Sequence, residues 1–371
     1  MNISCGKENL LKALSICVNA VNERTSVEAL KCFKLEALEN KLIITSNNLE
    51  TNIISELKAT VNKSGKTLVH AKTFFNIISK LPAGEVTIYL SENNTVIIQG
   101  GNSTFNIFTS NINDFPENMK IEEYKEIKLD INMFKDMVRR VSFAASNEEE
   151  KLILNGVLVD ILKDQQKLLF VAADGYRLAK DDINFETNEN ITAIIPIMTI
   201  KEALNIINIL EVKELVIRLG QNKVLFLCDH ISLYSRLITG KFPDYKLLIP
   251  QEHKLQIKIN RKELLDGCER INIIAQRNSY MVKIEVIEEN LVISSVTPDF
   301  GDGSEKIKIK TKGDKAIQVI FNVRLMIEVL KNLETDQIFI DIINDEKPIV
   351  IKEENNKEYI YIMMPIKVKR D

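Results

Sequence analysis

Hydrophobic and polar positions follow a similar order three times along the chain. Each repeat begins with a short alternation of apolar and polar residues, which predicts a strand, and then crosses a polar turn into a predicted helix. The three segments read NISCGKENLLKALSICVNAVNE from Asn2, IKLDINMFKDMVRRVSFAASNE from Ile127 and LQIKINRKELLDGCERINIIAQ from Leu255. Internal similarity of this kind indicates a chain built from like structural units.

Two of these predicted helices carry clear local signals. In the second repeat, apolar residues fall at i, i+3, i+4, i+7 and i+11, which places them on one face of a helix. They are Phe134, Met137, Val138, Val141 and Ala145. In the third repeat, Asn260 stands three residues before Glu263, the spacing of a capping box with asparagine as the N-cap.

A second helix and a pair of strands recur in each third. The helices are predicted in AKTFFNIISKLP from Ala71, IMTIKEALNIINIL from Ile197 and NVRLMIEVLKNLE from Asn322. Turn residues then separate two strands of similar length. These turns are at Asn93-Asn94, Gly220-Gln221-Asn222 and Asn344-Asp345.

A proline closes each unit, at Pro116, Pro243 and Pro365. The spacing predicts three domains, at residues 1–122, 123–252 and 253–371. Each is expected to be an α+β domain with two helices and mostly antiparallel strands. The joins between them are short and polar, which favours a fixed arrangement of the domains.

Composition narrows the class of protein. The chain has 371 residues, of which 45% are hydrophobic and 27% charged, as in ordinary globular proteins. No apolar run approaches the roughly 20 residues that span a membrane, and no signal peptide is visible, so we expect a cytoplasmic protein. The five scattered cysteines and three histidines form no zinc motif, and reduced, buried thiols are expected. A net charge of −3 neither indicates nor excludes a nucleic-acid partner.

The stretch VAADGYRLAK, from Val171, has the look of an active-site loop. Asp174 and Gly175, however, are also turn residues, and no histidine or second carboxylate lies nearby. Phosphate-binding glycine motifs are missing from the sequence. We therefore expect no catalytic residue, metal or cofactor. The alternative is a small-molecule enzyme that uses Asp174, Tyr176 and Arg177.

Five segments, in order, carry a resemblance to a known family. VAADGYRLA resembles the Thr-Asp-Gly-His-Arg-Leu-Ala signature of the bacterial DNA sliding clamps, the β subunits of DNA polymerase III. SNNLETNI from Ser46 and LILNGVLVD from Leu152 are similar to two further segments of that family. GKFPDYKLLIP from Gly240 and YIMMPIKV from Tyr361 resemble its Phe-Pro-Asp-Tyr and Met-Pro segments. The resemblance covers the whole chain.

The resemblance implies three clamp domains per chain and two chains joined head to tail in a closed ring. Helices would line the hole and sheets would form the outer shell. The ring would encircle duplex DNA, as a non-catalytic processivity factor associated with the nucleoid. Implied partners are DNA, a second copy of the chain, the polymerase III alpha subunit, the clamp loader and repair proteins. A monomeric scaffold that kept the fold but does not encircle DNA is a further hypothesis.

A sliding ring needs diffuse positive charge that contacts phosphates without reading bases. The resemblance and the basic positions of the predicted helices together suggest a set of DNA-facing residues. They are Arg24, Lys72, Lys135, Arg139, Arg140, Lys201 and Arg270. An ordinary solvated helix face is the alternative interpretation of each.

The resemblance also implies a cleft that takes short peptides, which would insert a Leu or Phe. The matching residues are Leu154, Ala173, Gly175, Tyr176, Arg177, Leu178, Pro243, Leu247, Leu248, Ile362, Met363, Met364 and Pro365. Four positions depart from the family: Ala173 replaces Thr, Tyr176 replaces His, Leu247 stands where many members have Arg, and Leu325 stands where some have an aromatic residue. The cleft is therefore expected to be more apolar. For Met363 and Met364, packing within the core is the alternative.

Ring closure should use one sheet edge from each end of the chain, in a heterologous interface. Phe105 and Ile107 of the first domain are expected to face Ile273 and Ile274 in the third domain of the other copy. Burial in the core is the alternative for these four residues.

Overall fold

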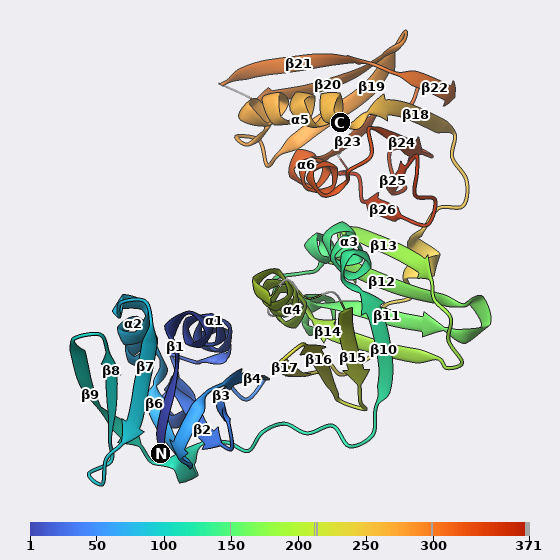
Figure 1. Ribbon diagram of the computed structural model, residues 1–371. Helices are drawn as coiled ribbons and strands as arrows, with labels where there is room; N and C mark the ends of the chain where they lie inside the picture. Colours follow the sequence, from blue (N-terminus) through green and yellow to red (C-terminus); the bar gives the residue numbers. More distant parts are fainter. Residues whose placement is uncertain (149, 211, 213, 298–299, 368–371) are drawn as a thin grey trace. The chain divides into compact units, whose positions relative to one another are not determined.

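The computed structural model describes residues 1–148, 150–210, 212, 214–297 and 300–367. Contacts between residues divide the chain into two compact units, whose helices and strands are labelled in Figure 1. The first comprises residues 1–134 and 198–237, and the second comprises residues 135–197 and those from 238 onward. Each unit is described by itself.

One antiparallel sheet of 13 strands forms the scaffold of the first unit, in the order β10-β15-β16-β17-β4-β3-β2-β6-β9-β8-β7-β1-β5. Its strands are β1 Asn2–Gly6, β2 Cys32–Leu38, β3 Lys41–Asn47, β4 Thr51–Lys58, β5 Thr60–Lys63, β6 Gly65–His70, β7 Glu85–Leu90, β8 Thr95–Gly100, β9 Ser103–Ser110, β10 Lys125–Asp130, β15 Glu214–Leu219, β16 Lys223–Cys228 and β17 Ile231–Arg236. The pairing of β17 with β4 joins the middle and first thirds of the sequence in one sheet.

Helices α1 (Lys7–Cys17), α2 (Ala71–Lys80) and α4 (Ile197–Leu210) accompany this sheet. Short 3-10 turns lie at η1 (Val18–Ala20), η2 (Glu28–Lys31) and η3 (Ile112–Asp114). Helix α1 packs against α2 and β4. Each helix buries one apolar face. The buried residues include Leu10 and Leu14 in α1, Phe74 and Ile78 in α2, and Ile206 in α4.

The second unit contains a nine-stranded sheet and a four-stranded sheet, ordered β14-β11-β12-β13-β26-β25-β24-β18-β22 and β21-β20-β19-β23. Their strands are β11 Gly156–Leu162, β12 Lys167–Ala173, β13 Arg177–Asn184, β14 Ile191–Pro196, β18 Leu255–Asn260, β19 Met281–Ile287, β20 Asn290–Thr297, β21 Gly301–Lys308, β22 Lys310–Gly313, β23 Val319–Asn322, β24 Gln337–Ile342, β25 Ile349–Glu353 and β26 Ile360–Met363. Strands β13 and β26 pair antiparallel, with Arg177 opposite Met363, so the middle and last thirds also share a sheet.

Helices α3 (Ile131–Val141), α5 (Arg261–Ala275) and α6 (Val323–Asn332) belong to this part of the chain, although α3 begins in the first unit. The 3-10 turns are η4 (Ser142–Ala144), η5 (Leu152–Asn155), η6 (Lys163–Gln165) and η7 (Tyr245–Leu248). Helices α5 and α6 pack together. The expected N-cap is confirmed, because the Asn260 side chain accepts a hydrogen bond from the Glu263 backbone N–H at 3.0 Å.

The predicted helices and turns are confirmed, with one difference at the end of α3. The apolar pattern predicted a helix as far as Ala145, whereas α3 ends at Val141 and tightens into η4. Ala145 is buried but extended, with φ −66° and ψ 147°. The two compact units divide the chain differently from the predicted thirds, and the boundaries near residues 122 and 252 stay a prediction.

Candidate functional site

The loop between β12 and β13 is a hydrogen-bonded turn. Oδ1 of Asp174 accepts hydrogen bonds from the backbone N–H groups of Tyr176 (2.8 Å) and Arg177 (3.0 Å). Gly175 has φ +96°, a conformation that side chains disfavour. Asp174 and Gly175 thus form the turn, and the Asp174 carboxylate stabilises it through these two hydrogen bonds.

The Arg177 side chain fastens this turn to two other elements. Its guanidinium donates to the Asp174 carboxylate at 3.0 Å, to the Phe143 carbonyl at 2.8 Å, and to Glu328 of α6. It also lies over the Phe143 ring, 5.5 Å from the centroid. The side chain is only 8% exposed. Arg177 therefore positions the loop and offers little surface to a ligand.

A buried apolar cluster lies beneath the turn. It comprises Leu158, Val171, Ala173, Leu178, Ile194, Phe242, Tyr245, Val350 and Ile362, with Leu154 among the half-buried residues packed on it. These residues come from β11, β12, β13, β14, β25 and β26 and from the segment around η7. The structure thus brings together predicted residues that are far apart in the sequence.

Large apolar side chains remain exposed on elements that contribute to this cluster. Tyr176 is 62% exposed, and Leu247 and Leu248 of η7 are 83% and 50% exposed. Met364 is also exposed, and its backbone N–H donates to the Tyr176 carbonyl at 2.8 Å. The cluster with these exposed residues is the candidate ligand site, and we call it the apolar cleft after the peptide cleft that the family resemblance predicts. Pro243 and Gly175 are exposed as well, whereas Pro365 is buried.

Two residues near the apolar cleft were missed from the sequence. Leu152 of η5 is 68% exposed. Lys151 lies with Nζ 5.1 Å from the centre of the Tyr176 ring and donates to the Asp174 carbonyl at 3.0 Å. Both residues come shortly before the Leu154-Asn155-Gly156 segment. Their closeness to that family motif is the feature of the sequence from which they could have been predicted.

Met363 needs a correction. Its side chain is fully buried, and it follows Ile362, which belongs to the apolar cluster. Because side chains alternate along a strand, Met363 lies on the opposite face of β26 from Ile362. Core packing is therefore its role, and of the two methionines only Met364 is exposed.

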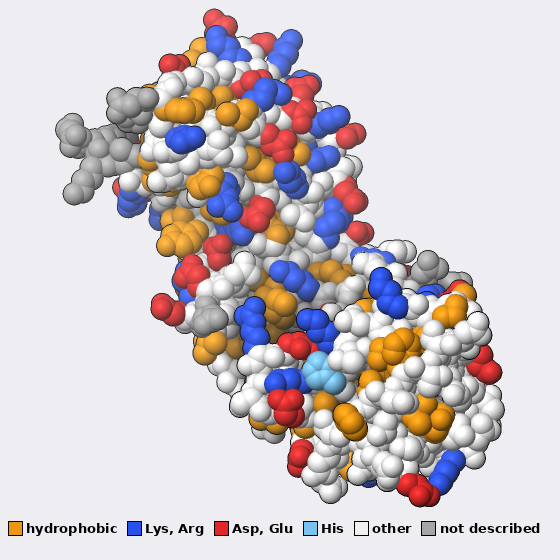
Figure 2. Space-filling model, turned by 90° about the vertical axis from the view of Figure 1, so that its left-hand side faces the viewer, with side chains coloured by type: hydrophobic (Ala, Val, Ile, Leu, Met, Phe, Trp, Pro, Cys, Tyr) orange, Lys and Arg blue, Asp and Glu red, His pale blue; other side chains and the backbone are white. Residues whose placement is uncertain are grey.

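The predicted DNA-facing residues fall into two groups. On the face drawn in Figure 2, acidic and basic side chains are interspersed and hydrophobic side chains reach the surface between them, so each basic residue has to be judged by its own contacts. Arg24, Lys72 and Lys201 are exposed, and Lys135 is half-buried. Within the described residues, these four side chains form no ion pair. They remain available to phosphates.

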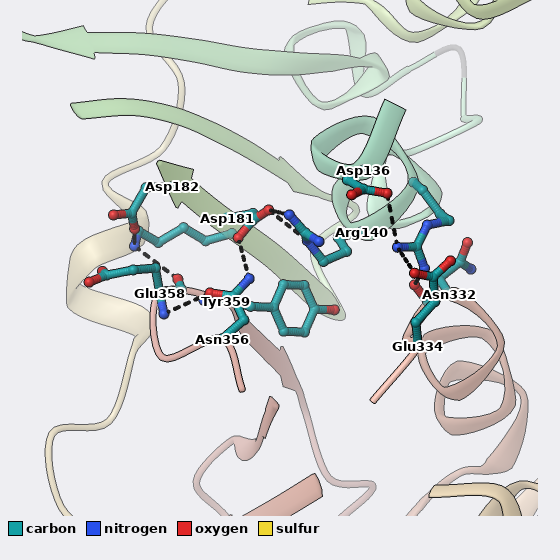
Figure 3. A network of polar contacts seen from close by, with 11 residues as sticks. Asp136, Arg140, Asp181, Asp182, Asn332, Glu334, Asn356, Glu358 and Tyr359 are labelled. Atoms are coloured by element: carbon teal, nitrogen blue, oxygen red, sulfur yellow. Dashed lines mark hydrogen bonds and ion pairs between the residues drawn. The ribbon is translucent and has the colours of Figure 1, made fainter. Parts of the chain in front are cut away.

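The side chains of Arg140 and Arg139 pair with groups of the same unit (Figure 3). Their predicted role as DNA-facing residues is therefore corrected. Arg140 forms an ion pair with the fully buried carboxylate of Asp181, at 2.6 Å and 2.7 Å from two guanidinium nitrogens. Arg139 donates to the Asn332 carbonyl at 2.7 Å and pairs with Asp136 and Glu334. These arginines connect α3 to β13 and to the end of α6.

Arg270 is exposed but already paired, since two of its nitrogens contact Glu305 of β21 at 2.7 Å and 3.1 Å. An exposed pair of this kind is weak, so Arg270 can exchange Glu305 for a phosphate more readily than Arg140 can leave Asp181.

The four predicted interface residues are not in the core. Phe105 and Ile273 are exposed, and Ile107 and Ile274 are half-buried. Among the described residues, the Ser103–Phe108 part of β9 pairs only with β8, and β21 pairs only with β20. A Cβ built on Gly303 would lie 3.4 Å from Ile274, so Ile274 lies beside the edge strand β21.

No group of His, Cys, Asp and Glu in the described parts of the chain could hold a metal ion. The five cysteines are buried and unbonded, as expected. Over the same residues, none of the helices has the length and hydropathy needed to cross a membrane.

Comparison with known families decides the assignment. Residues 1–120, 128–244 and 246–367 match, in order, the N-terminal, central and C-terminal domains of the DNA polymerase III beta subunit. The chain belongs to the DNA polymerase III beta subunit family. It is thus a beta sliding clamp, a non-catalytic processivity factor with the three-domain clamp fold, and the enzyme hypothesis is wrong. Clamp membership implies DNA and a polymerase as partners.

Individual clamps agree over nearly their full lengths. The beta sliding clamp of Bacillus subtilis is 27% identical, covering 99% of this chain and 100% of that protein. The beta sliding clamp of Rickettsia felis is 29% identical, covering 97% of this chain and 98% of that protein. The crystal structure of the B. subtilis clamp has a TM-score of 0.94 at 26% identity, and it covers 100% of both chains. The Thermotoga maritima beta subunit has a TM-score of 0.92 at 25% identity, covering 99% of this chain and 100% of its own.

Proposed function

We propose that two copies of this chain close head to tail into a ring around duplex DNA. We further propose that the apolar cleft binds short peptides of the polymerase III alpha subunit, the clamp loader and other proteins with a clamp-binding motif. The ring would act at the nucleoid in the cytoplasm. Each copy would contribute three domains, at residues 1–122, 123–252 and 253–371.

The observation that carries the peptide proposal is the exposure of large apolar side chains over a packed floor. Leu247, Tyr176 and Leu152 are each more than 60% exposed. Contiguous exposed apolar surface commonly marks a binding site. A related clamp has a site for a chain-like ligand: the C. crescentus beta sliding clamp, 25% identical with a TM-score of 0.93, binds a polyethylene glycol at its proposed beta-motif tethering region.

Fluorescence anisotropy with a labelled 12-residue peptide containing a Leu-Phe pair tests the apolar cleft. Tyr176→Ala and Leu247→Ala remove exposed side chains and should each weaken binding by about fivefold to thirtyfold, as for interface hot spots. Leu38→Ala, at the exposed end of β2, is the matched control. Equal affinity of all four proteins for the peptide would overturn the assignment.

Sequence-independent DNA contact is supported by the unpaired basic residues. Four basic residues from different elements or loops form no ion pair with another described residue. They are Arg24, Lys72, Lys135 and Lys201. Scattered ammonium and guanidinium groups attract phosphates without reading bases. We assign Arg270 to the same set and give Arg139 and Arg140 structural roles.

Ring closure is supported by the two open strand edges. The outer part of β9 carries Phe105 and Ile107, and the edge strand β21 lies beside Ile274. An open edge with apolar side chains favours pairing with another chain. Edge-to-edge pairing of β9 with β21 of a second copy would bury both edges in a heterologous interface.

Light scattering across a dilution series tests the dimer. The chain mass is 42.3 kDa, so a ring of two copies should have twice that mass. Ile273→Glu should shift the equilibrium to monomer, because it places a charge in the proposed interface. Ile287→Glu, at an exposed position in the β19–β20 hairpin, is the control. A strict monomer at micromolar concentration would favour the monomeric scaffold hypothesis.

A further inference from the structure

A hollow opens beside η7, between the segment Tyr245 to Gln251 and the outer ends of β11, β12 and β13. Its volume is about 360 Å³. Leu162, Leu169, Ile249 and Ile360 give it an apolar part. Charged and neutral polar side chains line the rest, and we call this hollow the Lys246 pocket.

The Lys246 pocket continues the apolar cleft along one face of the sheet. In β13, Leu178 belongs to the cleft floor, and Lys180 and Asp182 line the pocket. In β26 the corresponding residues are Ile362 and Ile360. Residues two apart on a strand share a face, so both sites open on the same side. Tyr245 belongs to both and links them.

The hydroxyl of Tyr245 has no hydrogen-bond partner among the described residues. The residue is only 5% exposed. Burial, followed by the carboxylates of Asp160, Asp182 and Asp244, raises the pKa of Tyr245 to about 12. The hydroxyl therefore stays protonated and can donate. A buried hydroxyl without a partner is costly, so a ligand acceptor at this point would be favoured.

Of the charged groups that line the pocket, Lys246 alone is unpaired among the described residues. Lys167 and Lys180 both donate to the nearly buried carboxylate of Asp182, and Lys167 also pairs with Glu358 (the two carboxylates are labelled in Figure 3). These contacts leave Asp182 little capacity for a further cation. Lys246 is exposed and, within the described chain, has no ion pair. Its ammonium group is the one free to meet a ligand charge.

We propose that the Lys246 pocket binds an acidic side chain of the same peptide that occupies the apolar cleft. This inference rests on the proposed peptide-binding function. Leu178 and Asp182 are four residues apart on β13, a separation of about 13 Å at the rise of an extended strand. An extended peptide would thus present its carboxylate about four residues from the hydrophobic pair.

Paired peptides test the inference by fluorescence anisotropy. Each contains a Leu-Phe pair, with Glu-Glu or Gln-Gln centred four residues from it, and both directions from the pair are made. In one direction the Glu peptide should bind about fivefold to thirtyfold more tightly than its Gln counterpart, from one ion pair and one hydrogen bond. Raising the salt from 50 to 300 mM should reduce this preference.

Three variants locate the effect. Lys246→Glu should abolish the preference for Glu or reverse it, while binding of the Gln peptide is kept. Tyr245→Phe should reduce the preference about threefold or more through the lost hydroxyl. Lys241→Glu, an exposed lysine nearby that does not line the pocket, should leave the preference unchanged.

The failures of the two proposals are distinguishable. If neither the Glu nor the Gln peptide binds, the peptide-binding function itself fails. If both bind equally in both directions, or if Lys241→Glu and Lys246→Glu act alike, only the Lys246 pocket is overturned.

Discussion

Replacing Arg140 by methionine is expected to destabilise the second unit by about 3 kcal/mol, because it leaves a buried carboxylate without its charged partner. The Asp181 side chain is fully buried, and two nitrogens of Arg140 contact it at 2.6 Å and 2.7 Å. One hydrogen bond remains in the variant, from the Asn356 amide at 3.1 Å. That bond places the estimate at the lower end of the roughly 3–5 kcal/mol observed when one partner of a buried pair is removed.

The loss of stability should depend on pH. Burial raises the pKa of Asp181 above its ordinary value, and Arg140 opposes that rise. Removing Arg140 therefore raises the pKa further. A carboxyl whose pKa is higher in the folded than in the unfolded protein destabilises the fold progressively as the pH rises from its unfolded-state pKa to its folded-state pKa. The penalty is lost again as the pH falls back through that range. The loss should be smaller at pH 5 than at pH 7.5.

Calorimetric unfolding at these two pH values measures both effects. A loss of about 3 kcal/mol corresponds to a fall in midpoint of about 6–12 °C for a unit of this size. Arg139→Met is the matched control on the same helix, and its partly exposed contacts should cost about 1 kcal/mol or less. Adding Asp181→Asn to Arg140→Met should recover much of the loss. Equal losses for Arg139→Met and Arg140→Met, or a loss independent of pH, would refute the reasoning.

Further predictions concern the turn at the apolar cleft and the thiols. Gly175→Ala should cost about 1–2 kcal/mol and weaken peptide binding, since φ +96° strains any side chain; unchanged melting and affinity would contradict this. Arg177→Lys should weaken peptide binding and lower the melting temperature, because lysine cannot replace the forked contacts of this nearly buried guanidinium to Asp174, Glu328 and Phe143. Burial raises the pKa of the Cys5 and Cys268 thiols to about 12, so iodoacetamide at pH 8 should label them, by intact mass, only after unfolding.

The sequence was sufficient for the local structure, because the signals are local. The Asn260 cap and the apolar face of α3 depend on residues within a few positions of one another. The pairings of β17 with β4 and of β13 with β26 join distant thirds, and no short pattern announces them. The register of strands so far apart in the sequence depends on the packing of the whole sheet and its helices.

The candidate sites show the same limit. Arg140 and Arg139 have the sequence pattern of an exposed basic helix face, yet their partners lie 41 and 193 residues away along the chain. Arg177 likewise contacts Glu328 at a separation of 151 residues. By contrast, the apolar floor around Leu178 and Ile362 followed from family motifs, and the structure brings these residues together.

An end-blocking experiment on linear duplex DNA tests most directly whether the protein encircles DNA as a closed ring. A closed ring can thread only over a free end, so blocking both ends with biotin and streptavidin before adding the protein should prevent association. Blocking them afterwards should trap the protein, even when the salt is raised enough to remove phosphate contacts. We predict retention only when the ends are blocked after the protein is added. Equal retention in both orders, or loss in high salt in both, would contradict encirclement and indicate binding to an open surface.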